Sequence, residues 1–299
     1  MSELSHSARR PTVRSLIRAG ARRLARARVS FGHGTDNAQD EAAALVWHAL
    51  LLPYPATRAS YARRVGVRAQ QKVHALIARR IRERIPAAYL IGRARFAGLE
   101  FIVDPRVLIP RSCIAELIER GFAPWIEPAR VRRVLDLGTG SGCIAIGCAR
   151  ALPSARVDAV DVSAQALEVA RVNVRRHRVG KRVRLVQSDH FSALARATYD
   201  IIVSNPPYVG ARELAALPAE YRHEPRIALA AGREGLDSIR TILRDAARHL
   251  RPRGILVVET GNTEAAVRRV FAQLPLTWLH FERGGGGVFL LTAEQLHVR

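Results

Sequence analysis

Cysteines, acidic residues and long apolar runs are all scarce in this chain of 299 residues. The three cysteines, Cys113, Cys143 and Cys148, are too few and too irregularly spaced for a disulfide framework, and no histidine stands near them at metal-ligand spacing. No apolar stretch reaches the roughly 18 residues that a membrane-spanning helix needs. The sequence therefore predicts a protein of the reducing cytoplasm with no disulfide, no metal site and no membrane segment.

Basic residues outnumber acidic residues by 48 to 26, so the formal net charge is +22, and lysine occurs only at Lys72 and Lys181. An arginine-rich surface attracts polyanions. A compositional bias toward arginine explains the same count without any partner. Because the arginines are spread along the whole chain and do not form one stripe, the sequence indicates an anionic neighbourhood but no surface that reads a nucleic acid.

The length and the hydrophobic content of 48% predict two domains. Between about residues 13 and 84, apolar residues recur with the 3.6-residue period of helices, and Pro53 and Pro55 interrupt the pattern. The next segment, "AAYLIGRARFAGLEFIVDPRVLIP", has the aromatic and β-branched residues and the turn glycines of a hairpin. We expect a helical substrate-recognition domain over residues 1–85, a linking β-hairpin over 86–111 and a larger domain over 112–299.

Short apolar runs alternate with helical stretches in the larger domain. The runs read "RRVLDLG", "ARVDAVDV", "VRLVQSD", "YDIIVSN" and "GILVVET". This alternation predicts an α/β fold with an open, doubly wound parallel sheet. The closing segments "LTWLHFER" and "GGGVFLLTA" predict an antiparallel hairpin at its edge. Ser112 is placed to cap the helix "CIAELIERGF", and Cys143 and Cys148 are expected to fill the core.

Ligands of such sheets bind beyond the carboxyl ends of the strands, so the residues that follow each strand are candidates for a site. In "VLDLGTGSGCIAI", Gly138, Gly140 and Gly142 allow a tight turn and a close approach of the backbone to a ligand. A nicotinamide dinucleotide also binds to such a loop. Asp136, just before the glycines, repels a pyrophosphate and accepts a cationic or hydroxyl-bearing ligand, which favours S-adenosylmethionine.

Carboxylates end three further strands. Asp161 in "DAVDVS" is suited to both hydroxyls of a ribose; the alternative, a helix cap, is a role that Ser163 can fill as well. Asp189 in "VQSDHF" is suited to the amino group of adenine or is a plain loop residue. Glu259 in "VVETGN" either structures its loop or faces the substrate.

The stretch "YDIIVSNPPYVG" ends a strand in Asn205, Pro206, Pro207 and Tyr208. Asn205 offers an amide, Pro206 offers a backbone carbonyl, and Tyr208 offers a flat wall with a hydroxyl tip. A planar nitrogen is a poor nucleophile because its lone pair is delocalised. If Asn205 and Pro206 accept its two N–H bonds, they direct the lone pair at an electrophilic methyl group, and no strong base is required.

"NPPY" together with "DLGTGSG" resembles the amino-methyltransferases that use S-adenosylmethionine, which include DNA adenine and protein glutamine methyltransferases. The flanking "EPRIALAAGREGL" is similar to the glutamine N5-methyltransferases, apart from the inserted Arg226 and Ile227. "LIPRSCIAELIE", "FGHGTDNAQDEA" and "GGGGVFLLTAEQL" resemble the branch that acts on a ribosomal protein and not on release factors. Cys113 departs from this branch, which commonly has proline there. The resemblance extends over residues 15–296.

The resemblance implies a Rossmann-like class I S-adenosylmethionine methyltransferase fold. It also implies N5-methylation of a glutamine in the third protein of the large ribosomal subunit. With this substrate, the arginine-rich surface is expected to meet ribosomal RNA or an assembly intermediate. The family's catalytic residues fall on Asn205, Pro206, Pro207 and Tyr208, and its cofactor-binding residues on Asp136, Gly138, Thr139, Gly140, Ser141, Gly142, Asp161, Asp189 and Asn205.

Three other functions remain open from the sequence: methylation of a release factor, N6-methylation of adenine in a nucleic acid, and a non-enzymatic RNA-binding assembly role. An adenine enzyme ordinarily carries a target-recognition insert and a route to a flipped base, for which the short connections around Asn205 leave little room. A non-enzymatic role is disfavoured because every strand-end residue that the chemistry needs is present. The sequence does not set the oligomeric state.

Overall fold

The computed structural model describes residues 10–53 and 56–297. The chain divides into two compact units, Met1–Gly92 and Arg93–Arg299. The hairpin that was expected as a linker packs Phe96 and Phe101 into the core of the second unit. The domain boundaries expected from the sequence remain predictions.

The first unit is helical, as the apolar periodicity predicted. Polar side chains begin its first two helices, because Thr12 accepts a hydrogen bond from Ser15 N and Asn37 accepts one from Asp40 N. A fully buried ion pair joins Arg80 to Glu41 at 2.6 Å inside this core. The helices are α1 (Val13–Arg26), α2 (Ala38–Ala49), α3 (Arg58–Ala62), α4 (Val67–Glu83) and α5 (Ala87–Ile91).

One part of the hairpin prediction was wrong. Residues 87–91 form the short helix α5, which ends at Gly92 in the left-handed conformation. The hairpin itself is limited to β1 (Arg93–Phe96) and β2 (Leu99–Ile102), which pair antiparallel around Gly98. The aromatic and β-branched composition signalled the strands, but it did not separate them from the helical turn before them.

A seven-stranded sheet forms the centre of the second unit, in the order β5-β4-β3-β6-β7-β9-β8. The five strands predicted from the apolar runs are parallel, and the closing hairpin adds β9 and β8 antiparallel at the edge of β7. The Rossmann-like α/β prediction is therefore confirmed. The strands are β3 (Arg133–Leu137), β4 (Arg156–Asp161), β5 (Val183–Gln187), β6 (Tyr199–Ser204), β7 (Leu250–Glu259), β8 (Thr277–Trp278) and β9 (Val288–Thr292).

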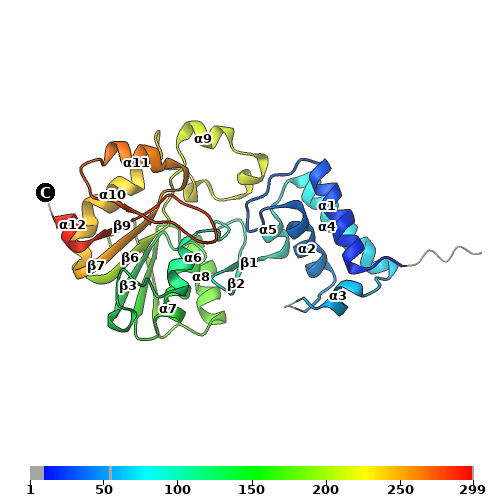
Figure 1. Ribbon diagram of the computed structural model, residues 1–299, viewed down its shortest axis with the longest axis horizontal. Helices are drawn as coiled ribbons and strands as arrows, with labels where there is room; N and C mark the ends of the chain where they lie inside the picture. The colour runs from blue at the N-terminus through cyan, green and yellow to red at the C-terminus, as the bar shows by residue number, and fades with distance from the viewer. Residues whose placement is uncertain (1–9, 54–55, 298–299) are drawn as a thin grey trace, which may run out of the picture. The chain divides into compact units, whose positions relative to one another are not determined.

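Helices cover both faces of this sheet (Figure 1). Neighbouring residues of one strand point to opposite faces, so Val134 packs on one side and Leu135 on the other. The first face is covered by α6 (Ile114–Glu119), α7 (Cys143–Ala151) and α8 (Ala164–Arg176). The second face is covered by α10 (Asp237–Asp245), α11 (Glu264–Val270) and α12 (Ala293–His297).

Within residues 10–53 and 56–297, the connections carry α9 (Ala211–Ala216) and five short 3₁₀ helices. Two further sequence predictions concern helix α7 and the start of α6. Cys143 and Cys148 lie buried in α7 and fill the core as expected. The residue at the N-cap of α6 is Cys113, one position after the predicted Ser112. The 3₁₀ helices are Pro128–Arg130, Ala219–His223, Arg226–Ala228, Ala246–His249 and Gly261–Thr263.

Among the residues that the structure describes, no helix combines the length and the apolar character that crossing a membrane requires.

Candidate active site

The carboxyl ends of β4, β3, β6 and β7 lie side by side, because these strands are parallel neighbours in register. The hydroxyl of Ser204, the last residue of β6, donates a hydrogen bond of 2.8 Å to the carbonyl of Leu137, the last residue of β3. A Cβ atom placed on Gly138 would lie 3.9 Å from the backbone carbonyl oxygen of Asn205. The glycine loop and the Asn-Pro-Pro-Tyr segment therefore meet at one edge of the sheet.

A cavity of about 360 Å³ opens at this edge. Its wall contains seven of the residues predicted from the sequence, and it adds side chains from the segment after the hairpin and from the connection before α10. The predicted residues in the wall are Gly138, Gly140, Asp161, Asp189, Asn205, Pro206 and Pro207. The structure thus brings together residues that lie up to 69 positions apart in the sequence.

Asp136 lies behind the glycine loop and is completely buried. Its Oδ2 accepts hydrogen bonds from the Thr139 hydroxyl at 2.6 Å and from Ala145 N at 3.0 Å. Its Oδ1 has no hydrogen-bond partner among the described residues. Burial raises the pKa of this carboxyl to about 7. Asp136 therefore ties the loop to the start of α7, and direct contact with a cofactor stays a prediction.

Three other predicted loop residues also lie outside the cavity wall. Thr139 and Ser141 are buried, and the carbonyl of Ser141 accepts a hydrogen bond of 2.9 Å from Asn173. Gly142 precedes α7, and a Cβ atom there would lie 3.3 Å from the Cβ of Ala170 in α8. The contacts of all three shape the loop from behind. Their predicted role in cofactor binding remains untested.

Asp161 stands at the tip of β4 in the cavity wall. Its two carboxylate oxygens accept hydrogen bonds from Gly140 N at 2.8 Å and from Ser163 N at 2.9 Å. Ser163 caps α8 with its own hydroxyl, so Asp161 is not needed as the cap. Each carboxylate oxygen keeps a further lone pair for a hydroxyl group. The neighbouring Val162, 46% exposed, adds an apolar surface suited to a flat ring.

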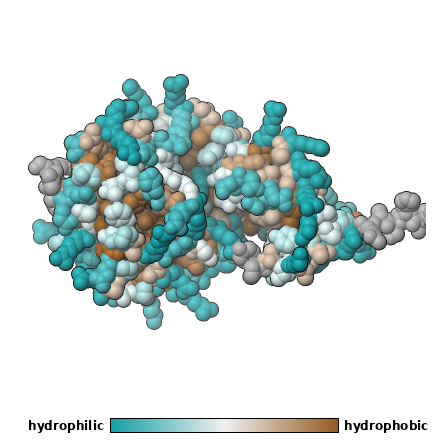
Figure 2. Space-filling view, viewed as in Figure 1, coloured by the Kyte–Doolittle hydropathy of each residue, from teal (hydrophilic) through white to brown (hydrophobic). Residues whose placement is uncertain are grey.

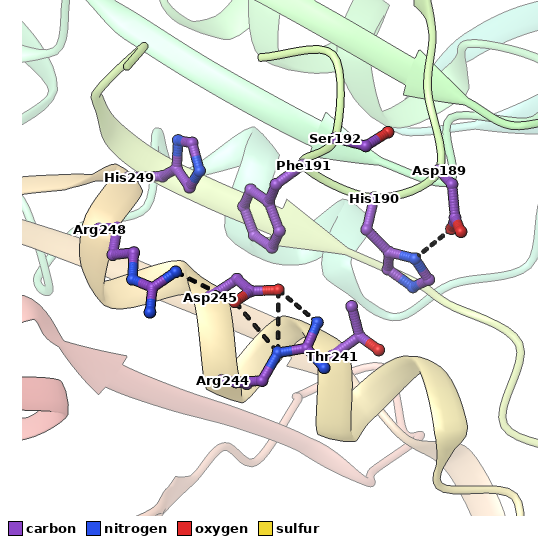
Figure 3. Close-up of a pocket in the computed structure, with 9 residues that line it drawn as sticks. All are labelled: Asp189, His190, Phe191, Ser192, Thr241, Arg244, Asp245, Arg248 and His249. Carbon is purple, nitrogen blue, oxygen red and sulfur yellow. Dashed lines mark hydrogen bonds and ion pairs between the residues drawn. The ribbon is translucent and has the colours of Figure 1, made fainter. Parts of the chain in front are cut away.

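Asp189 lies between this cavity and a second one of about 420 Å³ (Figure 3). Its carboxylate is 2.6 Å from the ring of His190, which also borders both cavities. Behind them, Phe191 stacks on His249 at 4.7 Å between ring centroids, and His249 contacts the carbonyl of Ala197 at 2.8 Å. These contacts hold the loop after β5 in place. The adenine contact predicted for Asp189 remains a prediction.

Asn205 is the central polar residue of the cavity wall. Its side-chain carbonyl oxygen is buried and has no hydrogen-bond partner among the described residues. Buried polar atoms without partners are uncommon because each costs free energy, so such an atom in a cavity wall is a candidate for ligand binding. The atom is an acceptor, and the matching ligand group is an N–H donor.

Tyr208 does not border the cavity, unlike the three residues before it. The chain after it is fixed to the segment before α10, because Val209 N donates to the carbonyl of Leu229 at 2.8 Å. A Cβ atom on Gly261 would lie 2.5 Å from Cε2 of the Tyr208 ring. Burial and the nearby Glu259 raise the pKa of the phenol, which therefore stays protonated at neutral pH. Tyr208 offers a positioned flat ring and no base.

Buried charged groups surround Tyr208. The Ser112 hydroxyl donates to Glu259 and also accepts from Ile114 N at 3.1 Å. Burial raises the pKa of Glu259 to about 7, and Arg111 opposes this rise. Arg111 donates two hydrogen bonds, of 2.6 and 2.7 Å, to the buried carboxylate of Glu224. Both proposed roles of Glu259 remain open, since it structures its loop through Ser112 and also lies near Tyr208.

Several residues of the cavity wall were missed by the sequence analysis. Val107 and Leu108 come from the segment after the hairpin, and Ile227 comes from the insertion that departs from the family pattern. Ile227 is 55% exposed although it is large and apolar. An apolar residue on a loop carries no periodic signal, so only the tertiary structure reveals this part of the wall.

Comparisons with known proteins identify the family of the chain. Residues 121–219 match the family model described as the methyltransferase small domain. Over 286 residues the chain is 48% identical to the ribosomal protein uL3 glutamine methyltransferase of Neisseria meningitidis serogroup B, covering 95% of this chain and 94% of the relative. The same description applies to relatives from Bordetella pertussis, 48% identical over 96% of this chain and 97% of the relative, and Burkholderia pseudomallei, 46% identical over 95% of each.

A solved structure also shares the fold. It is the hMettl16 catalytic domain in complex with a 3'UTR hairpin, 17% identical with a TM-score of 0.50 over 76% of this chain and 81% of that chain. This level of likeness bears on the fold alone.

The buried carboxyl of Asp136 makes stability depend on pH. Its pKa rises on folding from 3.8 to about 7, so its stabilising effect is complete below pH 3.8 and is lost as the pH rises through about 7. Asp136→Asn keeps an acceptor for Thr139 and Ala145 but never ionises. Between about pH 5 and pH 8 we expect the free energy of unfolding of the variant to fall less than that of the unmodified protein, by at most about 3 kcal/mol.

Urea denaturation of both proteins at the two pH values measures this difference. Asp245→Asn is the control, because a hydrogen bond from Arg244 lowers the pKa of Asp245 and places its effect at acid pH. Equal pH slopes for the unmodified protein and Asp136→Asn would contradict the assignment.

Proposed function

The chain belongs to the family of the ribosomal protein uL3 glutamine methyltransferases, and from this membership we propose that it methylates the side-chain amide nitrogen, N5, of a glutamine in uL3. The methyl donor is S-adenosylmethionine. The observation that carries the proposal is the buried side-chain oxygen of Asn205 in the cavity wall, which has no hydrogen-bond partner in the described part of the chain. A primary amide has the N–H donors that this oxygen lacks.

The cavity suits the methyl donor. Asp161 presents a carboxylate to ribose hydroxyls, and Val162 presents an apolar surface to the adenine ring. Gly138 and Gly140 leave the backbone accessible beside them. When it is bound, S-adenosylmethionine supplies an electrophilic methyl group on a sulfonium centre. The residues of this chain therefore need to position a nucleophile and need not generate a strong one.

Asn205 and Pro206 position that nucleophile. The Asn205 side-chain oxygen accepts one N–H of the substrate amide, and the Pro206 carbonyl accepts the other. Both acceptors draw the amide nitrogen away from planarity with its carbonyl and aim its lone pair at the methyl group. Since the two prolines fix the backbone of the clamp, little reorganisation is needed, and positioning supplies most of the rate gain. The surplus proton passes to water after methyl transfer.

Tyr208 supports the substrate from the side away from the cofactor cavity. Its ring lies with Glu259 and Arg111 and not in the cavity wall. A glutamine side chain that enters along this ring reaches the clamp from the face opposite the methyl donor, as an in-line transfer requires. The protonated phenol then orients the substrate without acting as a base.

The substrate assignment has further consequences for partners and location. The protein partner is uL3, and contact with ribosomal RNA or an assembly intermediate accompanies this substrate. The same reasoning places the enzyme in the cytoplasm. The runner-up substrates, a release-factor glutamine and a nucleic-acid adenine, present the same planar N–H donors to Asn205, so only the product identifies the substrate.

The proposal is tested by labelled methyl transfer from S-adenosylmethionine to large-subunit proteins from cells that lack this enzyme. Digestion and mass spectrometry then locate the label. Label on one glutamine of uL3 supports the proposal. Label on a release factor or on RNA adenine keeps the fold and the cofactor but replaces the substrate.

Asn205→Ala separates catalysis from cofactor binding. Because the clamp acts on the substrate nitrogen, we expect the single-turnover rate to fall by about 100-fold or more while the affinity for S-adenosylmethionine is largely kept. Asp161→Ala is the matched contrast, with cofactor affinity reduced by roughly 10- to 100-fold in calorimetry. An unchanged single-turnover rate removes Asn205 from the mechanism, and unchanged calorimetric affinity removes Asp161 from the ribose site.

Gly261→Ala tests the position of the Tyr208 ring. The new Cβ would lie 2.5 Å from the ring, so the phenol must move, and we expect kcat to fall by roughly 10- to 100-fold with little change in cofactor affinity. Gly284→Ala is the control, because this glycine also has a positive φ, +82°, but no described atom lies within 4 Å of its Cβ position. Equal kcat values for the two variants would show that the ring position does not matter.

A further inference from the structure

The positive charge of this chain is concentrated in the helical unit. Met1–Gly92 holds 17 of the 48 Lys and Arg residues but only 5 of the 26 Asp and Glu residues, so it carries +12 of the net +22 in less than a third of the length. The basic residues extend along the whole chain, as stated above, so they alone do not account for this concentration. The acidic residues are what is unevenly distributed, since they are gathered in the second unit.

Helix α1 carries a regular row of these charges, which we call the arginine ladder: Arg14, Arg18, Arg22 and Arg26. All four are exposed, and α1 contains no acidic residue. A spacing of four residues places successive side chains about 6 Å apart along one side of a helix. The opposite side, with Val13 and Leu24, is buried in the core. Figure 2 shows hydrophilic residues over α1.

The ladder differs from three arginines of helix α4 in its partners. Arg80 is paired with Glu41, and Arg79 and Arg82 are paired with Glu83. Within the described residues, no ladder arginine forms an ion pair with a carboxylate. Like charges four residues apart on a helix repel each other and destabilise it. An anionic partner with repeated charges relieves this repulsion, whereas an isolated anion does not.

A hollow of about 280 Å³ adjoins the first half of the ladder. It is lined by Arg14, Arg18, Ile17, Gln39 and Tyr61. The guanidinium of Arg14 lies 5.9 Å from the centre of the Tyr61 ring. The hollow thus combines an aromatic face, an amide and two cations. Single-stranded nucleic acids are bound by this combination, with bases on aromatic rings and phosphates on arginines.

We propose that the arginine ladder and the Tyr61 hollow form an RNA-binding surface, with successive phosphates on the ladder and a base in the hollow. The choice of RNA rests on the proposed function, because a ribosomal protein substrate is met together with ribosomal RNA. An acidic protein segment would match the charge, but it leaves the aromatic and amide groups of the hollow unused. The surface lies within the helical unit and involves no residue assigned to the methyl-transfer site.

Fluorescence anisotropy of the full chain with a labelled single-stranded RNA of about 16 nucleotides tests the proposal. The ladder variant changes Arg14, Arg18, Arg22 and Arg26 to Gln, which keeps a good helix former at each position. Each arginine–phosphate contact contributes about 0.7 to the slope of log affinity against log salt. We expect the variant to lose about 3 in slope and more than about tenfold in affinity near 0.1 M salt.

A control variant removes the same charge from the second unit. It changes Arg150, Arg171, Arg175 and Arg178 to Gln, all exposed and without an ion pair to a carboxylate in the described residues. We expect its affinity for RNA to stay close to that of the unmodified protein. Equal losses in the two variants would overturn the proposal, because they would show that RNA responds only to net charge.

The hollow is tested separately with Tyr61→Leu, which removes the aromatic face and keeps an apolar side chain. We expect RNA affinity to fall several-fold, while affinity for heparin, a polyanion without bases, stays unchanged. Tyr61→Phe should retain RNA binding. If Tyr61→Leu weakens RNA and heparin binding equally, or weakens neither, the hollow does not bind a base. If polyglutamate binds as tightly as RNA and the ladder variant loses this binding, the partner of the surface is an acidic protein.

The methyl-transfer assay distinguishes failure of this inference from failure of the proposed function. We expect the ladder variant to methylate isolated uL3 with an unchanged single-turnover rate when uL3 is saturating, because no ladder residue lines the methyl-transfer cavity. If neither protein methylates uL3, the proposed function fails, and the RNA measurements still decide the ladder. If both methylate it and bind RNA equally, only the ladder assignment fails.

Discussion

Parallel pairing of β6 beside β3 is the constraint on which the active site depends. It places the last residue of β6 against the last residue of β3, where Ser204 donates to the Leu137 carbonyl. The chain leaves one strand as the glycine loop and the other as the Asn205–Pro206 segment, the proposed substrate clamp. Because β4 pairs on the far side of β3, Asp161 reaches the same edge. A change of register by one residue would turn each of these ends to the other face of the sheet.

Buried polar atoms at this edge serve two different purposes. Asp136 is buried and has no counter-ion among the described residues. It accepts hydrogen bonds from Thr139 and Ala145, so it shapes the loop at a cost in stability at neutral pH. The side-chain carbonyl oxygen of Asn205 is buried and has no partner in the described chain. Under the proposed function, an N–H of the substrate donates a hydrogen bond to it. Asp136 thus shapes the loop, whereas under the proposed function the Asn205 oxygen accepts its hydrogen bond from the substrate amide.

The strands and their polar ends were predictable from the sequence because each signal is local. An apolar run followed by Gly138, Asp161 or Asn205 identifies a strand end without knowledge of its neighbours. The rest of the cavity wall was not predictable, because Leu108 and Ile227 come from connecting segments that only the folded chain brings to the cavity. The place of the Tyr208 ring was also missed, because it depends on Gly261, a contact across 53 residues.

Arginine has three different structural roles in this chain, so net charge alone is a poor guide to function. In Arg80 and Arg111 it neutralises a buried carboxylate, and removing either would leave an uncompensated charge in the core. In surface pairs such as Arg79–Glu83 it adds little stability. In the arginine ladder it has regular spacing, exposure and no carboxylate partner in the described residues. A compositional bias explains the number of arginines but not their four-residue spacing beside the Tyr61 hollow. This arrangement, and not the total of +22, is the feature on which the proposed RNA-binding surface rests.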